Sequence, residues 1–222
     1  MFVFSNLAMS LDGKIATCER SFFPLGTAED LKQMEVLRRR CDAIVMGAST
    51  MRVYQKPCVI SGQTKQPINI LISSRLAGLD PRWPFFKSSK IRRILFVTEG
   101  IEKSTLMRFS RSSEVVLLKK PGPKHPVARQ ILTHLKAQNL TRILVEGGGG
   151  VMWDFASQNL IDEYHVTLTP KIVGGATAPS LVDGQGFKPS EVLNLKLRQC
   201  TVLGDEIFLT YAKTKTSTRR KN

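Results

Sequence analysis

Short apolar runs recur along the chain, and helix-forming stretches lie between several of them. Runs rich in Val, Ile, Leu and Phe are typical of buried strands. They predict strands at 2–9, 42–47, 68–73, 93–98, 114–118 and 142–146. Helices are expected at 27–40, directly after Gly47, near 126–138, and from the glycines at 147–150 through WDFASQNL. Alternating strands and helices indicate an α/β fold with a largely parallel sheet and helices on both faces.

The helix expected at 27–40 carries the clearest local signals. Thr27 can accept a hydrogen bond from the first turn, and the acidic residues that follow it suit the positive end of the helix dipole. Leu31, Met34 and Leu37 recur at helical spacing, which predicts one apolar face.

The last part of the chain has a different pattern. EYHVTLTP at 163–170 alternates like a strand, and 193–200 and 206–212 flank a Leu-Gly-Asp turn that is typical of a hairpin. An antiparallel C-terminal pair makes the sheet mixed. The segments 55–67 and 78–90 contain Pro and Gly and predict loops.

Composition fits ordinary globular proteins. The chain has 222 residues, of which 42% are hydrophobic and 23% charged. No window approaches the ~20 apolar residues of a membrane span. MFVFSNLAMSLDGK lacks the features of a signal peptide, so a cytoplasmic location is expected. With no repeat and no domain-sized linker, we expect one domain over 1–212 and a basic disordered tail over 213–222.

Cysteine and histidine usage gives no sign of a metal site. Cys18, Cys41, Cys58 and Cys200 lie far apart without a C-x-x-C pair, and the chain has three histidines. We expect free thiols and no bound metal.

The net charge is +15, from 33 Lys and Arg against 18 Asp and Glu. Five of the cations lie in KTKTSTRRKN at the end of the chain, and the body without them keeps a charge of +10. The positive electrostatic field of such a charge speeds the encounter with an anionic substrate or cofactor. It also fits a non-catalytic nucleic-acid-binding protein. We rank that alternative lower because no segment interleaves basic and aromatic residues.

Four consecutive glycines follow an apolar run in LVEGGGGVMWDF. In parallel sheets, ligands bind beyond the carboxyl ends of the strands, where free N–H groups at a helix start attract phosphate. Glycines there would give a diphosphate room to touch the backbone. A tight turn without a ligand explains the run equally well, because it matches neither G-x-G-x-x-G nor G-K-[ST].

A second strand end repeats this arrangement and favours the ligand. VMGASTMRVY places Gly47 after a strand and Ser49 or Thr50 at the start of a helix. The next strand ends in Ser73-Ser74-Arg75, whose hydroxyls and guanidinium suit a phosphate monoester. Together these features predict a dinucleotide with an additional 2′-phosphate, which is NADPH.

Four motifs then carry a family resemblance. AMSLDGKIAT, DAIVMGAST, LVEGGGG and PKIVGGATAPSLVDGQGF resemble the reductase domain of bifunctional riboflavin-biosynthesis proteins, and the resemblance runs from about 2 to 212. It implies a three-layer dihydrofolate-reductase-like fold, a homodimer, and NADPH-dependent reduction of the ribosyl group of a phosphorylated ribosylaminopyrimidine to ribityl. The H-x-E and P-C-x-x-C motifs of the deaminase half are not in this sequence, so the resemblance is to a stand-alone reductase.

The resemblance also implies roles for individual residues. The cofactor would lie on Gly47, Ser49, Thr50, Met51, Ser73, Ser74, Arg75, Gly147, Gly148, Gly149 and Val151. The substrate would meet Asn6, Ala8, Ser10, Thr27 and Arg38. Asp12 and Glu146 are the catalytic candidates, and Asp12, Lys14, Glu146 or water would deliver the proton.

One departure from the family concerns the sugar phosphate. The family continues after G-x-x-T with D-[ND]-P-x-L-x-x-R, whose aspartate and arginine hold that group, whereas this chain reads MRVYQKPCVISG. Tyr54 stands where the aspartate is expected. Lys56, Arg52 or Lys65 could supply the positive charge instead.

A related reductase remains as the main alternative. LGTAEDLKQMEVLRRRCDAIVMGASTM also resembles dihydrofolate reductases, in which a helix carboxylate binds the pterin ring. Asp30 falls near the place of that carboxylate. If Asp30 faces the cleft, a pterin or folate would suit the site.

Overall fold

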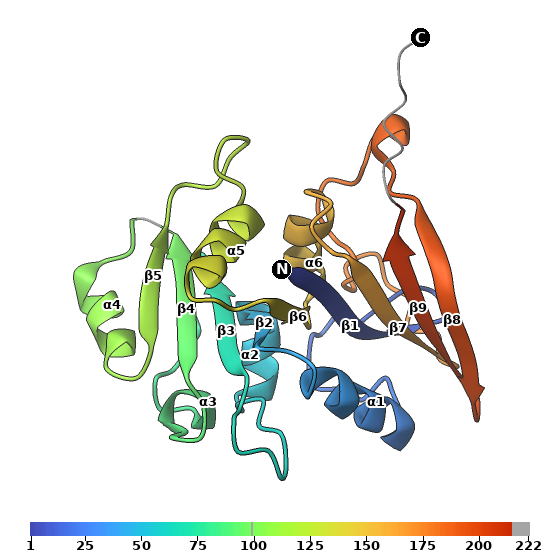
Figure 1. Ribbon diagram of the computed structural model, residues 1–222, viewed down its shortest axis with the longest axis horizontal. Helices are drawn as coiled ribbons and strands as arrows, with labels where there is room; N and C mark the ends of the chain where they lie inside the picture. The colour runs from blue at the N-terminus through green and yellow to red at the C-terminus, as the bar shows by residue number, and fades with distance from the viewer. Residues whose placement is uncertain (99, 215–222) are drawn as a thin grey trace.

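A nine-stranded mixed sheet forms the centre of the part of the chain that the computed structural model describes, residues 1–98 and 100–214 (Figure 1). The strands are β1 (Phe2–Ser10), β2 (Ala43–Gly47), β3 (Ile68–Ser73), β4 (Arg93–Thr98), β5 (Glu114–Leu118), β6 (Arg142–Val145), β7 (Glu163–Thr169), β8 (Leu195–Leu203) and β9 (Glu206–Lys213). Their order is β5-β4-β3-β2-β6-β1-β7-β9-β8. The pairings from β5 to β7 are parallel, and β9 is antiparallel to both β7 and β8.

Helices cover both faces of this sheet, which gives three layers. They are α1 (Ala28–Arg38), α2 (Ala48–Tyr54), α3 (Pro84–Lys87), α4 (Lys103–Ser110), α5 (Val127–Ala137) and α6 (Gly149–Ala156), with a 3₁₀ turn, η1, at Pro189–Glu191. Helices α1, α2 and α4 pack on one face of the sheet, where they bury Leu37, Met51 and Phe109 in a common core. Ile131 and Phe155 carry α5 and α6 into the core on the other face. Burial of each such side chain contributes about 1.5–3 kcal/mol.

The expected fold class and hairpin are confirmed, and three details differ. The segment 78–90 is not all loop, because Pro84 starts the short helix α3 and buries Phe85 and Phe86. The helix α4 has no counterpart among the expected elements. On α1, Leu37 is buried, whereas Leu31 is 58% exposed and borders a cavity instead of the core.

The expected boundary of the basic tail also shifts. Lys213 ends β9, where its N–H donates to the Asp162 carbonyl and its ammonium pairs with the Asp162 carboxylate. Thr214 of that predicted tail is also described, with its hydroxyl donating to the Asn194 carbonyl at 2.9 Å. Residues 215–222 lie outside the described residues. Among the helices that are described, none is long and apolar enough to cross a membrane.

The connections of β2 and β6 create the crevice that positions the site. These strands are parallel neighbours, yet α2 after β2 packs on one face of the sheet and α6 after β6 packs on the other. The segments that follow β2 and β6 therefore diverge to opposite faces of the sheet at the carboxyl ends of these adjacent strands. Such switch points are where ligands bind in open α/β sheets.

Candidate active site

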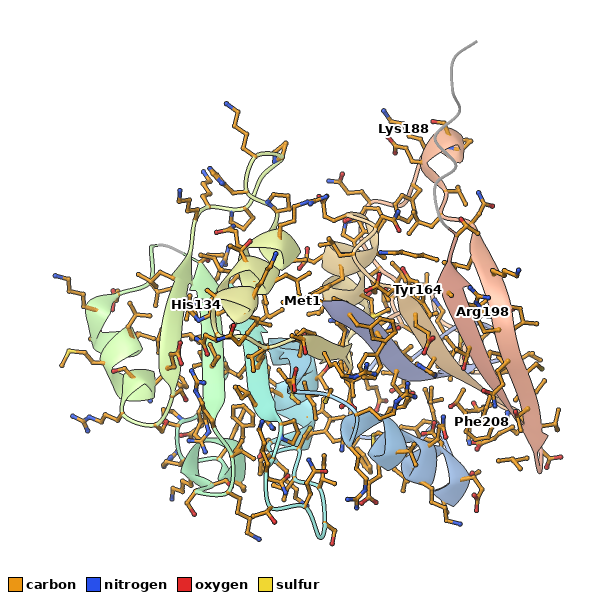
Figure 2. All side chains as sticks on the ribbon, in the orientation of Figure 1. Met1, His134, Tyr164, Lys188, Arg198 and Phe208 are labelled. Carbon is orange, nitrogen blue, oxygen red and sulfur yellow. The ribbon has the colours of Figure 1, made fainter. Side chains whose placement is uncertain are left out.

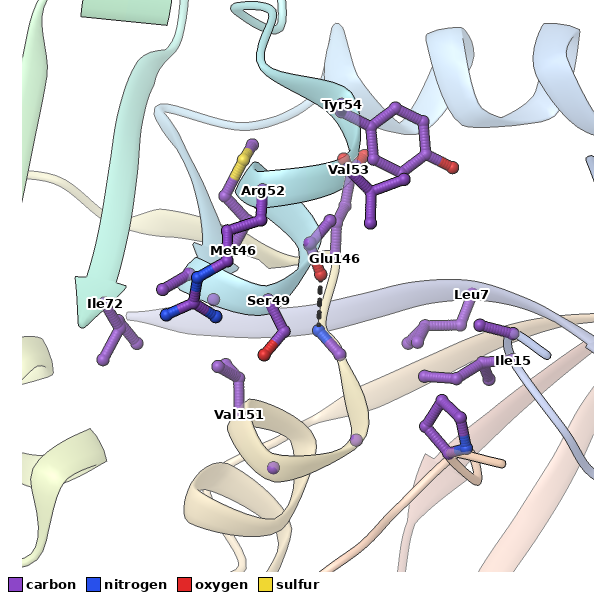
Figure 3. Close-up of a pocket in the computed structure, with 18 of the residues that line it drawn as sticks. Leu7, Ile15, Met46, Ser49, Arg52, Val53, Tyr54, Ile72, Glu146 and Val151 are labelled. Atoms are coloured by element: carbon purple, nitrogen blue, oxygen red, sulfur yellow. Dashed lines mark hydrogen bonds between the residues drawn. The ribbon is translucent and has the colours of Figure 1, made fainter. Parts of the chain in front are cut away.

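A cavity of about 1160 Å³ opens at this switch point (Figure 3). Many of the residues expected at the site line it: Asn6, Ala8, Arg38, Gly47, Ser49, Thr50, Ser73, Ser74, Arg75, Glu146, Gly148, Gly149 and Val151. Five expected residues are not in its lining: Ser10, Asp12, Thr27, Met51 and Gly147. The lining combines the ends of β2, β3 and β6, so the segments that separately suggested phosphate binding share one cavity.

The two glycine turns are joined directly to each other. The Gly47 N–H donates to the Gly147 carbonyl at 2.8 Å. The Gly148 N–H donates to Thr50 Oγ1 at 3.1 Å. These bonds fix the spacing between the turn after β2 and the turn after β6. Met51, on the same helix as Thr50, is fully buried in the core, which explains its absence from the cavity.

The four consecutive glycines have different reasons to be glycine. Gly147 has φ +84°, and a side chain there would press on Leu7. A side chain on Gly149 would overlap the Asp183 carboxylate and the Ser180 carbonyl. Packing within the chain therefore accounts for these two positions.

Gly148 and Gly150 face space that the chain leaves open. The nearest atom to a Cβ on Gly148 would be Thr50 Oγ1 at 3.7 Å, and nothing lies within 4 Å of a Cβ on Gly150. Both positions line the cavity. This open backbone at the start of α6 fits the close approach of an anionic ligand.

The end of β3 forms another wall of the cavity. Ser73 Oγ accepts the Leu76 N–H at 3.0 Å, which turns the chain, and Thr98 Oγ1 donates to the Ser74 carbonyl at 2.7 Å. This turn leaves Ser74 and Arg75 exposed in the cavity lining. The hydroxyl and the guanidinium are the donors that a phosphate monoester requires.

Arg38 and Glu146 form a largely buried ion pair beside the cavity. Arg38 Nε donates to Glu146 Oε1 at 2.7 Å, and Nη2 donates to Oε2 at 2.6 Å. Although burial opposes it, the carboxylate raises the pKa of Arg38 above its usual value. The sequence suggested Arg38 as a substrate contact and Glu146 as a catalytic residue, and the fold places the two in one bidentate pair.

Asp30 of α1 also lines the cavity. The sequence alone did not decide whether this residue faces the cleft. Burial raises the pKa of its carboxyl, and the charges of Glu206 and Glu146 add to this, whereas a hydrogen bond from Thr167 opposes it. Among the described residues, no cation forms an ion pair with Asp30. The cavity therefore contains a carboxyl group that retains its proton to higher pH than an ordinary aspartic acid.

Thr27 has a structural role at the start of α1. Its Oγ1 accepts the Glu29 N–H at 3.3 Å, as expected for a cap, and donates to the Glu206 carboxylate at 2.7 Å. Glu206 is 1% exposed and also accepts the Thr27 N–H at 2.9 Å. The helix start that carries Asp30 is thus fixed to the C-terminal hairpin.

Asp12 does not line the cavity, contrary to its expected catalytic role. Its carboxylate accepts the Ser10 hydroxyl at 2.6 Å and the N–H groups of Val173 and Gly174 at 3.0 and 2.7 Å. These bonds, led by that of Ser10, lower the pKa of Asp12 to about 2. A carboxylate so stabilised in its ionised form is a poor proton donor.

Lys14 holds the same two segments together. Its ammonium donates to the Ala178 carbonyl at 3.1 Å, and its backbone bridges to Ser180. The adjacent Ile15 N–H donates to the Pro179 carbonyl at 2.9 Å, and Ile15 and Pro179 do line the cavity. The SLDGKIAT and GG-x-x-APSL motifs therefore pack together to form one wall of the cavity. Ile15 and Pro179 face the cavity, and the bonds of Lys14 support them.

The cations that could replace the missing sugar-phosphate residues lie in different places. Lys56 and Arg52 line the cavity, and Lys65 does not. Arg52 and Tyr54 leave α2 in opposite directions, with Arg52 extending toward Ile72 (Figure 3). Tyr54 is 53% exposed and packs edge-to-face on Phe22 at 5.4 Å.

A further carboxyl group, Asp154, was not anticipated. It lies on α6 in the cavity lining, together with Leu118, Pro121 and Val127. Burial raises its pKa to about 6. The helical register after the glycines is the signal that could have pointed to it, because one turn separates Asp154 from Gly150.

Comparison with known proteins gives consistent matches. A family model described as the RibD C-terminal domain matches residues 1–209. The 2,5-diamino-6-ribosylamino-4(3H)-pyrimidinone 5′-phosphate reductase of Methanothermobacter thermautotrophicus is 28% identical over 215 residues, which are 95% of this chain and 97% of that protein. The riboflavin biosynthesis protein RibD of Actinobacillus pleuropneumoniae is 25% identical, and the match covers 95% of this chain but 56% of the longer protein.

Solved structures share the fold. A pyrimidine reductase-like protein of Corynebacterium diphtheriae matches with a TM-score of 0.81 at 21% identity, covering 96% of this chain and 92% of the other. A dihydrofolate reductase of Enterococcus faecalis matches with a TM-score of 0.55 at 14% identity, covering 96% of this chain and 97% of the other.

Proposed function

Because the chain belongs to the RibD C-terminal domain family, we propose that it is an NADPH-dependent reductase of riboflavin biosynthesis. It reduces the ribosyl group of a phosphorylated ribosylaminopyrimidine to ribityl. The observation that carries this proposal is that one cavity holds the open glycine backbone, the Ser73–Arg75 turn and the Arg38–Glu146 pair. The first two suit a phosphorylated dinucleotide, and the third suits a polar heterocycle.

The cofactor end of the cavity is assigned from its donors. Ser49 and the backbone at Gly148 and Gly150 would hold the diphosphate, and Ser74 and Arg75 would hold the 2′-phosphate. Bound NADPH supplies the hydride for this reaction. The role of the chain is to orient cofactor and substrate and to exclude water from the contact between them.

The substrate end lies on the α1 side of the cavity. Asn6, Arg38 and Glu146 provide hydrogen-bonding groups for the pyrimidine, with the Arg38 guanidinium fixing the direction of the carboxylate. Lys56 is the proposed replacement for the missing phosphate-binding arginine, because it lines the cavity and Lys65 does not. Asp12, Ser10 and Thr27 contribute by holding the surrounding backbone.

Asp30 is the proposed proton donor. Hydride addition to C1′ of an open-chain imine leaves the ring-linked nitrogen in need of one proton. A carboxyl group with a raised pKa is protonated near neutral pH more often than an ordinary aspartic acid, which suits general acid catalysis. Glu146 is engaged by Arg38 through both of its oxygens and serves to position the substrate.

The non-deaminated pyrimidine is the proposed substrate. Its amino-bearing edge offers N–H donors, and Glu146, which lines the cavity, offers carboxylate oxygens as acceptors. The reductase of Methanothermobacter thermautotrophicus carries the name of that compound. In the deaminated form a carbonyl oxygen takes the place of the amino group and would face the Glu146 carboxylate without a proton to share.

A second candidate is reduction of dihydrofolate or another pterin. The specific observation in its favour is that Asp30 lines the cavity on the helix where a pterin-binding carboxylate would lie. The position of Arg38 and Glu146 beside Asp30 does not separate the two heterocycles, so substrate assays decide between them.

We also propose a homodimer that uses the C-terminal hairpin. β8 is an edge strand that exposes Leu195, Leu197, Val202 and Leu203. Figure 2 labels Arg198 and Phe208 on this hairpin at one end of the sheet. A long exposed apolar edge is a liability unless it is paired or covered. Sedimentation of the wild type and of Leu197→Glu tests this, and a wild-type monomer would contradict it.

The decisive experiment measures NADPH oxidation by the purified protein. The diamino pyrimidinone ribosyl phosphate, its deaminated counterpart and dihydrofolate are offered in parallel. We expect turnover with a pyrimidine, and the fastest with the diamino form. Turnover with dihydrofolate alone would replace the proposed function by the second candidate, and turnover with none of the three would refute both.

A further inference from the structure

Arg52 is held in an unusual way at one wall of the cavity. Its Nε and Nη2 both donate to the Ala77 carbonyl, at 3.2 and 2.8 Å. This carbonyl belongs to the turn that follows Ser73–Arg75. Although Arg52 is exposed, its side chain is thus fixed across the gap between α2 and the turn after β3.

Gly78 shapes the space that Arg52 occupies. It has φ +68°, and a Cβ at this position would lie 3.0 Å from Arg52 Nε. A larger residue would be strained in this backbone conformation and would press on the guanidinium. The turn therefore both receives the arginine and leaves room for it.

The guanidinium retains donors and an uncompensated charge. With Nε and one Nη2 proton used on Ala77, three of the five N–H groups remain for another acceptor. Within the described part of the chain, neither Arg52 nor Arg75 forms an ion pair with a carboxylate. Both side chains line the same cavity.

The direction of Arg52 assigns it to one end of that cavity. It extends from α2 toward Ile72, the residue before the Ser73–Arg75 turn, and away from Tyr54 (Figure 3). Arg52 and Arg75 therefore add positive charge to the lining of one cavity, which favours an anion bound there. A dianionic phosphate monoester satisfies both, because it offers several oxygens to charge-assisted hydrogen bonds.

We propose that Arg52 is a specificity-determining residue that clamps the 2′-phosphate of the cofactor together with Arg75. The proposal rests on the proposed function, in which NADPH occupies this cavity. It removes Arg52 from the candidates for the substrate phosphate and leaves Lys56 in that role. In this proposal the Ala77 carbonyl and Gly78 preorganise the Arg52 side chain, so that its guanidinium is already in position when the phosphate binds.

The test measures binding by titration calorimetry, without turnover. The ligands are NADPH, NADH, 2′,5′-ADP and 5′-AMP, and the proteins are the wild type, Arg52→Ala, Arg52→Lys and Arg75→Ala. Arg111→Ala, on the surface at the end of α4, is the matched control for removal of one positive charge. We expect Arg52→Ala to raise the Kd of NADPH and 2′,5′-ADP about 10- to 100-fold, as for a charge-assisted pair.

The other arms separate the possible outcomes. NADH and 5′-AMP should change by less than about threefold, and Arg52→Lys should lie between wild type and Arg52→Ala because it loses the planar fork. If Arg52→Ala lost affinity equally for NADPH and NADH, Arg52 would only be a structural anchor of the turn, and the proposal would be overturned. Unchanged binding of all four ligands in Arg52→Ala would also overturn the proposal and would return Arg52 to the candidates for the substrate phosphate. A wild type that binds neither dinucleotide would refute the proposed function itself.

Discussion

Arg38 on α1 and Glu146 after β6 lie 108 residues apart and meet in a bidentate pair, with Nε–Oε1 and Nη2–Oε2 distances of 2.7 and 2.6 Å. The Glu146 side chain is 9% exposed and that of Arg38 is 20% exposed. Such a pair fixes the orientation of both groups at the cavity. It also makes each group depend on the other, because a buried charge without its partner is strongly unfavourable.

Breaking this pair from one side should therefore destabilise the protein. We expect Arg38→Met to lower the free energy of unfolding by about 3 kcal/mol, since it leaves the Glu146 carboxylate unpaired. Arg38→Met combined with Glu146→Gln should recover a large part of that loss, because the uncompensated charge is gone. Urea denaturation of both variants measures this. A double variant no more stable than the single one would show that packing, and not charge, sets the loss.

Asp30 should produce a pH dependence of turnover. Its folded pKa is raised, so the protonated form that donates the proton is present at low pH and is lost as pH rises through that pKa. We expect kcat of the wild type to fall on this alkaline side. Asp30→Asn should lower kcat by about 10²- to 10⁴-fold and remove the transition, while NADPH affinity stays unchanged.

Glu29→Gln is the matched control for Asp30, because it removes a carboxylate from the same turn of α1 but on an exposed side chain. Its kcat profile should follow that of the wild type. If Asp30→Asn kept the wild-type profile, the proton would have to come from water or from another group.

The glycine run offers a matched pair of substitutions. Gly148→Ala places a Cβ in ordinary contact with Thr50, so stability should change by less than about 1 kcal/mol while the Kd for NADPH rises. Gly149→Ala forces a Cβ onto Asp183 and Ser180 and should cost about 1–3 kcal/mol of stability. Thermal unfolding and cofactor titration separate the two effects. Wild-type cofactor affinity in Gly148→Ala would return that glycine to a purely structural role.

Asp12 tests whether its motif is structural. Its folded pKa of about 2 lies below the usual 3.8, so it stabilises the fold above pH 3.8, and this contribution is lost as pH falls through about 2. We expect Asp12→Asn to lower the Tm at pH 7 and to approach the wild type as pH falls through about 2, where the wild-type carboxylate also becomes neutral. Its kcat at neutral pH should stay within about threefold of wild type. A loss of kcat without loss of Tm would restore the catalytic assignment.

The sequence by itself determined the local elements and the chemistry of single strand ends. The apolar runs, the Thr27 cap, the turn at Gly47 and the Ser73–Arg75 end are encoded by residues that are close neighbours in the chain. Periodicity and turn chemistry act over that range, so these features and the fold class could be predicted. Helix α3 was not predicted, because a single buried turn that starts with Pro84 is too short to show a helical period.

Only the tertiary structure decided which side chains share the cavity. The order β3-β2-β6-β1 brings together strand ends that are far apart in sequence, and it turns Arg38 and Glu146 into a pair. The same packing directs Asp12 toward the backbone at 173–174 and Asp30 into the cavity. No local signal separates these two aspartates. What distinguishes them is long-range: N–H groups at 173–174 satisfy Asp12, whereas Asp30 is largely buried and forms no ion pair within the part of the chain that the structure describes.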